Sequence, residues 1–107
     1  MRMFTNNEQT AKLIELGLLP KHIQEISDDG KLLLECMGYS IGELIEMLPE
    51  NVAKENEMPS TLNISLMNGE WCVQYADFLG TDFEFCNTEL VDTLYEMVVK
   101  LKEKGVI

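Results

Sequence analysis

The residues of this 107-residue chain with the most potential for chemistry are its one histidine, His22, and its three cysteines, Cys36, Cys72 and Cys86. A thiol beside an imidazole can act as a nucleophile with its base, so Cys72 or Cys86 could work together with His22. No residue near His22 in the sequence indicates that it acts as a base, and a cysteine could come close to it only through folding. We predict no catalytic residues and keep an enzyme of unrecognised type as an alternative.

Metal and cofactor sites are equally unsupported by the residue spacing. A zinc site needs about four cysteine, histidine or acidic ligands, and the cysteines show no CxxC spacing. Asp77, Asp82 and Glu84 could touch a hard cation, but they do not match an EF-hand loop. Gly38 and Gly42 are too few and wrongly spaced for a phosphate-binding loop. We therefore predict no metal and no cofactor.

The charge balance restricts the classes of partner. The net charge is −11, from 19 acidic and 8 basic residues, so the chain lacks the basic face that binds nucleic acid or an anionic membrane. The carboxylates could instead imitate nucleic acid, and an acidic inhibitor of a host DNA-binding protein is a second alternative. An even scatter of charge over the surface would argue against it.

Two features of the sequence indicate the cellular compartment of the protein. The chain has no run of about 18 apolar residues that could span a membrane, and its first residues turn polar at once, unlike a secretion signal. The odd number of scattered cysteines makes a disulfide framework improbable. We expect a cytoplasmic protein with reduced thiols.

The clearest structural signal is Asn68-Gly69, the preferred dipeptide of a type I′ hairpin turn. This turn predicts one register, which pairs Met67 with Glu70, Leu66 with Trp71, Ser65 with Cys72, Ile64 with Val73, Asn63 with Gln74, and Leu62 with Tyr75. One face is then apolar (Leu62, Ile64, Leu66, Trp71, Val73, Tyr75) and the other mostly polar. Such a sheet needs helices on one side only.

Other elements follow from caps and periodicity. Capping boxes at Thr5/Glu8 and Ser40/Glu43 predict helices over residues 6–16 and 41–48, and Asn87 or Thr88 should cap a last helix that ends at Gly105. Residues 31–37 and 83–86 are predicted as short strands, with a helical turn near 22–26, a surface connection over 49–60 and a loop over 79–82. We predict a single α+β domain over residues 1–107, a small, mainly antiparallel sheet with a central β-hairpin and helices packed on one face.

The polar face of the hairpin is the candidate interaction surface: Asn63, Ser65, Met67, Cys72 and Gln74. With no catalytic constellation, a non-catalytic protein-interaction module is the favoured function. Its partner would be another protein or a second copy of the chain. Methionines are adaptable at interfaces, and four are candidates for exposure: Met47, Met58, Met67 and Met97. The favoured interpretation of the methionines is that they fill gaps in the core.

Four stretches carry a family resemblance: YSIGELIEMLP at 39–49, ELVDTLYEMVVKLKEKG at 89–105, TAKLIELG at 10–17 and WCVQY at 71–75. Together they resemble small uncharacterised proteins of phages and prophages of Bacteroides-like gut bacteria. The resemblance implies a mobile-element origin and a bacterial cytoplasm. It implies no activity and no site residues.

Overall fold

The structure, a computed structural model, describes residues 1–19, 38–54, 57–77 and 79–107. These residues form three helices, α1 (Asn7–Glu15), α4 (Ile41–Met47) and α5 (Leu90–Glu103). They also form four strands, β1 (Asn51–Lys54), β2 (Glu57–Met67), β3 (Glu70–Asp77) and β4 (Gly80–Asn87), which pair antiparallel in chain order. The α+β class with an antiparallel sheet is confirmed. The predicted turn at 22–26 and strand at 31–37 lie outside the described residues.

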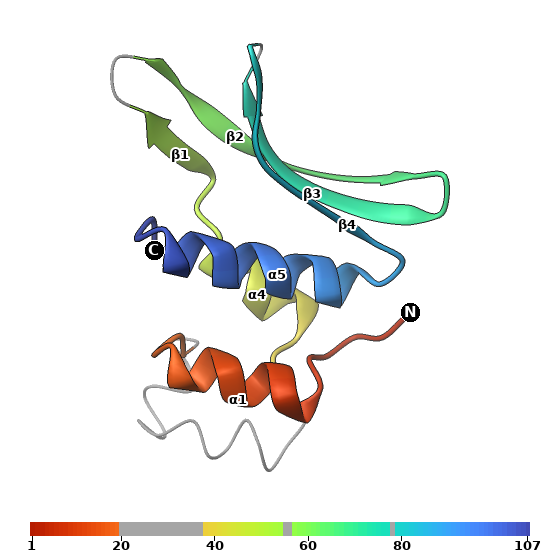
Figure 1. The fold of residues 1–107 in the computed structure, drawn as a ribbon. Helices are drawn as coiled ribbons and strands as arrows, with labels where there is room; N and C mark the ends of the chain where they lie inside the picture. The colour runs from red at the N-terminus through yellow and green to blue at the C-terminus, as the bar shows by residue number, and fades with distance from the viewer. Residues whose placement is uncertain (20–37, 55–56, 78) are drawn as a thin grey trace.

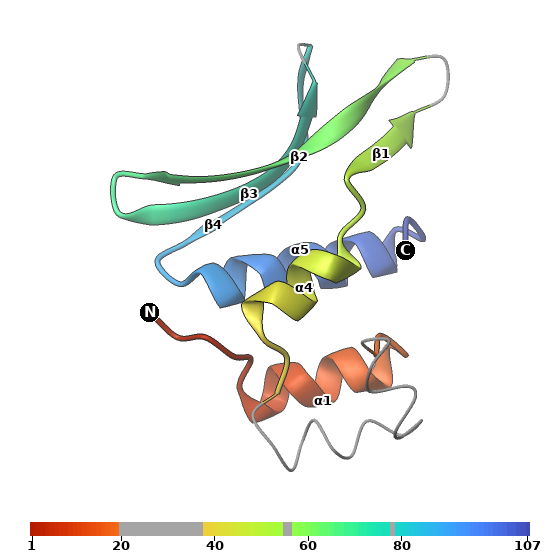
Figure 2. The same ribbon diagram turned by 180° about the vertical axis from the view of Figure 1, so that it is seen from behind.

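The helices lie on one side of the sheet, as Figure 1 shows, and Figure 2 gives the same arrangement from behind. Helix α5 is nearest to the sheet and runs beneath β3 and β4, with α4 beside it and α1 farther away. The face of the sheet that points away from α5 has no described helix over it. This one-sided coverage is the arrangement that the alternating hairpin sequence predicts.

The central hairpin has the predicted register at all six pairs, from Met67 with Glu70 to Leu62 with Tyr75. Asn68 and Gly69 have φ angles of 52° and 80°, the positive values that a type I′ turn requires. Val73 and Tyr75 are fully buried, and Leu62, Ile64 and Trp71 pack against the core from its margin. The local turn therefore sets which face of the hairpin meets the helices.

Leu66 departs from this pattern. It was expected beneath the helices, yet its side chain is 56% exposed. The reason is visible in Figure 1 and Figure 2, where the tip of the hairpin reaches past the N-terminal end of α5. Leu66 thus lies on the apolar face but beyond the helix that covers that face.

Two segments predicted as irregular contain strand. The expected surface connection over 49–60 is wrong, because β1 pairs with the start of β2 through Asn51 with Thr61 and Val52 with Ser60. The predicted loop over 79–82 is also mostly strand, since β4 begins at Gly80. A register shift in which Phe83 opposes Tyr75 and Thr81 opposes Ala76 accommodates the extra residue Asp82.

The helix caps agree with prediction at one helix and differ at two. Ser40 and Glu43 form the predicted capping box of α4. At α1 the box is formed by Asn6 and Gln9, not by Thr5 and Glu8, because Thr5 is engaged elsewhere. Glu89 is the N-cap of α5, but its side chain makes no capping hydrogen bond. The backbone N–H of Glu89 instead donates a hydrogen bond to the side chain of Asn87.

A buried polar cluster holds the segment before α1 against the segment before α4. Thr5 and Tyr39 are joined twice: the Thr5 N–H donates to the Tyr39 carbonyl (2.9 Å), and the Tyr39 N–H donates to Thr5 Oγ1 (2.9 Å). Thr10 Oγ1 donates to the Asn6 carbonyl, so the Thr5 hydroxyl supplies the proton of the 2.7 Å bond between the two threonines. Gly38, with φ of 86°, packs directly against these oxygens.

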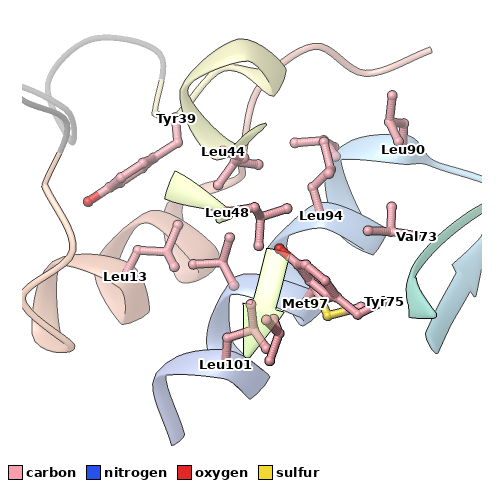
Figure 3. Packing of buried hydrophobic residues seen from close by; sticks show 13 residues of the cluster. Leu13, Tyr39, Leu44, Leu48, Val73, Tyr75, Leu90, Leu94, Met97 and Leu101 are labelled. Atoms are coloured by element: carbon pink, nitrogen blue, oxygen red, sulfur yellow. The ribbon is translucent and has the colours of Figure 1, made fainter. Parts of the chain in front are cut away.

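The core lies where α4, α5 and β3 meet. Figure 3 shows side chains from these elements converging, with Leu13 of α1 and Tyr39 at the margin toward α1. The α5 stripe is fully buried at Val91, Leu94, Val98 and Leu101. Met97 also has no exposed surface and fills the core, which is the favoured interpretation of the methionines: it lies on the face of α5 that meets the sheet and α4.

Candidate interaction surface

The five predicted interaction residues occupy the hairpin face that is turned away from α5. Asn63 and Met67 are exposed, Ser65 and Gln74 are half-buried, and Cys72 is buried. Met67 is the largest apolar side chain among them, at 59% exposed. Of the other methionines expected at the surface, Met47 is half-buried, and the side chain of Met58 is outside the described set.

Cys72 is buried because its sulfur is bonded to that of Cys86. The two residues face each other across β3 and β4, with Cα atoms 4.2 Å apart. The expectation of reduced thiols is therefore wrong for this pair, since adjacent strands bring together two cysteines that lie 14 residues apart in the chain. Cys36 lies outside the described residues.

This disulfide bears on the predicted cysteine–histidine alternative. Neither Cys72 nor Cys86 carries a thiol in this state, and a disulfide sulfur is not the thiolate that nucleophilic catalysis requires. His22 lies outside the described residues, so its distance to either sulfur is not defined.

The acidic residues near the turn between β3 and β4 have structural partners. Asp77 accepts hydrogen bonds from the backbone N–H groups of Leu79 (2.8 Å) and Gly80 (3.1 Å), which fixes the turn. Asp82 accepts a hydrogen bond from the buried hydroxyl of Ser60. Among the described residues, no three histidine, cysteine, aspartate or glutamate side chains are grouped so that they could hold a metal ion.

A groove that the sequence reasoning missed lies between β4 and α5. Its volume is about 280 Å³, and its lining combines apolar and charged side chains: Phe85, Tyr95, Glu96, Val99, Lys100 and Glu103. The sequence signal was weak, because periodicity places Tyr95 in the apolar stripe of the last helix with Leu90, Val91, Leu94, Val98 and Leu101, whereas it is only half-buried. The groove exists because Tyr95 and Val99 lie at the flank of that stripe and face the edge of the sheet.

The groove has a negative electrostatic environment. The pKa of the Tyr95 phenol is raised, first by burial and then by the charges of Glu96, Glu103 and Glu8. Three carboxylates on two helices, α1 and α5, thus act on one hydroxyl. An occupant with positive charge would be favoured here over a negative one.

Comparisons with protein-family models, with curated proteins and with solved structures give no match to this chain. In the described part of the chain, no helix is both long enough and apolar enough to cross a membrane.

Proposed function

We propose that this protein is a non-catalytic protein-interaction module that binds a partner protein through the outer face of its sheet. The observation that carries the proposal is the one-sided coverage of the sheet by described helices. The uncovered side carries the hydrogen-bonding groups of Asn63, Ser65 and Gln74 and, nearer the hairpin turn, the exposed thioether of Met67. Methionine is enriched at protein interfaces, because its flexible, polarisable side chain adapts to different partners.

The state of the cysteines favours binding over catalysis. Cys72 and Cys86 supply a covalent cross-link between β3 and β4 in place of a nucleophile. The cross-link fixes β3, which carries Cys72 and Gln74 of the outer face, against β4, and a fixed strand binds with a smaller loss of conformational entropy than a flexible one.

The proposal includes a bacterial cytoplasmic location and the phage or prophage origin that the resemblance implies. Disulfides are rare in that compartment, because glutathione and thioredoxin keep thiols reduced. The Cys72–Cys86 bond is the oxidised state of the pair, and reduction in that compartment would convert it to two thiols. Alkylation of the protein during rapid lysis, followed by mass spectrometry, tests the location: alkylated cysteines support it, and an intact disulfide would place the protein in an oxidising compartment.

The binding role is tested with two matched variants, Met67→Lys and Met3→Lys. Both replace an exposed methionine, 59% and 52% exposed, but only Met67 lies on the outer face of the sheet. Each purified variant and the unaltered chain are used to capture proteins from lysate of the source cells, and captured proteins are quantified by mass spectrometry. We expect a specific partner whose recovery falls with Met67→Lys and is unchanged with Met3→Lys.

A photo-reactive benzoylphenylalanine at Asn63 should also cross-link that partner, whereas the same group at the exposed Ala11 of α1 should not. Equal recovery with both methionine variants would refute docking on the outer face. If the chain captures no protein and is strictly monomeric by size-exclusion chromatography with light scattering, the proposed function itself fails.

A further inference from the structure

Strand β4 ends the sheet, and no described strand pairs with its outer edge. The Cα atoms of Cys72 and Cys86 are 4.2 Å apart, a separation typical of a non-hydrogen-bonded antiparallel pair. The N–H and C=O groups of Cys86 therefore point away from β3. Because the pattern alternates along the strand, the same holds for Glu84, which opposes Gln74. These two residues present four backbone groups to a further strand.

The edge of β4 has little protection against strand addition. Natural edges are commonly blocked by proline, lysine, bulges or extreme shortness. β4 has eight residues with no proline and no lysine, and its bulge at Asp82 lies outside the regular stretch from Phe83 to Asn87. That regular stretch is long enough to template another strand.

The groove between β4 and α5 lies directly below this edge. Phe85, on the helix-facing side of β4, and Tyr95 and Val99 of α5 form its apolar part. In a strand added to β4, every second side chain would point to the helix-facing side, into this groove. A free edge above an apolar groove between a strand and a helix is the arrangement that binds extended peptides by β-augmentation.

The charges around the groove select the occupant. Two exposed carboxylates, Glu96 and Glu103, line the groove beside Lys100, the one basic residue among the lining side chains, and the exposed Glu84 opposes Gln74 on the outer side of β4. A second copy of this chain would bring the same carboxylates together across a paired β4 edge, and each copy has a net charge of −11. Like charges that face each other across paired strands are destabilising, so self-pairing is disfavoured.

We propose that an extended, basic segment of another protein adds to β4 as a fifth strand. Its backbone pairs with Glu84 and Cys86, its alternate apolar side chains fill the groove beside Phe85, Tyr95 and Val99, and its lysines or arginines point to the opposite side of the sheet, near Glu84. This inference rests on the binding role proposed above but uses the edge of β4, which β3 separates from Met67 of β2, so the variants at Met67 and those at Glu84 report on separate sites.

The test uses a capped, fluorescently labelled heptapeptide that alternates lysine and valine, with binding followed by fluorescence anisotropy. Glu84→Pro removes the outward N–H at a position where no bond to β3 is lost, and its ring obstructs a fifth strand. Glu84→Ala is the matched control, which removes the same carboxylate but keeps the N–H. We expect Glu84→Pro to weaken binding about tenfold or more and Glu84→Ala only about two- to fivefold.

Two further peptides define the mode of binding. A peptide with glutamate in place of lysine should bind at least about tenfold more weakly, because its charges meet the Glu84 carboxylate on a chain of net charge −11. A lysine–valine peptide N-methylated at the residues that face β4 should lose binding to the unaltered chain. This second peptide keeps the test valid should Glu84→Pro fail to fold, as judged by circular dichroism.

Three results would overturn the inference. The first is no binding of the lysine–valine peptide, and the second is equal affinity for Glu84→Pro and Glu84→Ala, or for the methylated and unmethylated peptides. The third is a dimer in the absence of peptide that Glu84→Pro converts to monomer, since a second copy would then occupy the edge. If Met67→Lys no longer captures the partner but still binds the lysine–valine peptide, the β4 site is supported as a separate site.

Discussion

Replacement of Gly38 by alanine should destabilise the fold through two separate effects. Gly38 has φ of 86°, and the left-handed region costs an alanine about 1 to 2 kcal/mol. An added Cβ would also lie 2.7 Å from each of three oxygens, Thr10 Oγ1, Thr5 Oγ1 and the Thr5 carbonyl. Relief of that overlap would have to displace the buried threonine cluster, at a further cost of about 1 to 3 kcal/mol.

Gly17→Ala supplies the matched control. Gly17 has a closely similar φ of 77°, but a Cβ there would meet no atom within 4 Å. The control therefore carries the backbone cost without the overlap. We expect Gly38→Ala to lower the free energy of unfolding by about 2 to 5 kcal/mol and Gly17→Ala by about 1 to 2 kcal/mol.

Urea unfolding, followed by the fluorescence of the single tryptophan, Trp71, and by circular dichroism, measures both values. Amide hydrogen exchange should show that Gly38→Ala speeds exchange at Thr5 and Tyr39, whose N–H groups belong to the cluster. Equal destabilisation by the two substitutions would refute the packing of Gly38 against the threonines.

Two other predictions concern the disulfide and the tyrosines. Cys72→Ser or Cys86→Ser should lower the free energy of unfolding by about 3 kcal/mol, because the cross-link closes a loop with a sequence separation of 14. Cys36→Ser is the control. If the urea midpoint of the unaltered chain is the same with and without reductant, this prediction is contradicted. Burial raises the pKa of Tyr75 to about 12 and also raises the pKa of Tyr39 and Tyr95. The folded state thus holds these protons more tightly than the unfolded state, so stability should fall as pH rises from about 10 to about 12. The measurement is the absorbance of tyrosinate as a function of pH. If all three tyrosines titrate near pH 10 while the circular dichroism stays native, the raised pKa values are refuted.

The hairpin was predictable because its determinant is local. Asn68 and Gly69 adopt the positive φ angles that their types favour, and the register then follows from counting residues outward. The capping box at Ser40 and Glu43 is local in the same way.

Features that depend on distant partners were not predictable from local pattern. Thr5 has the side chain of a helix cap, but it bonds with Tyr39, 34 residues away, and Asn6 takes the cap. β1 has no apolar alternation of its own, and its pairing with β2 defines it as a strand.

The same distinction applies to the candidate sites. The outer face of the sheet followed from the hairpin register, and its residues are where the alternation places them. The groove could not be predicted, because Phe85 and Tyr95 belong to different elements whose separation depends on how α5 lies against the sheet. The Cys72–Cys86 pair likewise needed the register between β3 and β4, which the bulge at Asp82 shifts.

The central place of α5 has a consequence for folding during synthesis. The sheet, α4 and α1 all come before α5 in the chain, yet α5, with α4 beside it, forms the layer between the sheet and α1. At about 5 to 20 residues per second, the ribosome releases the β2–β3 hairpin on the order of one second before α5. Val73 and Tyr75 face water during that interval, so the nascent hairpin is a natural substrate for a chaperone that binds apolar strands.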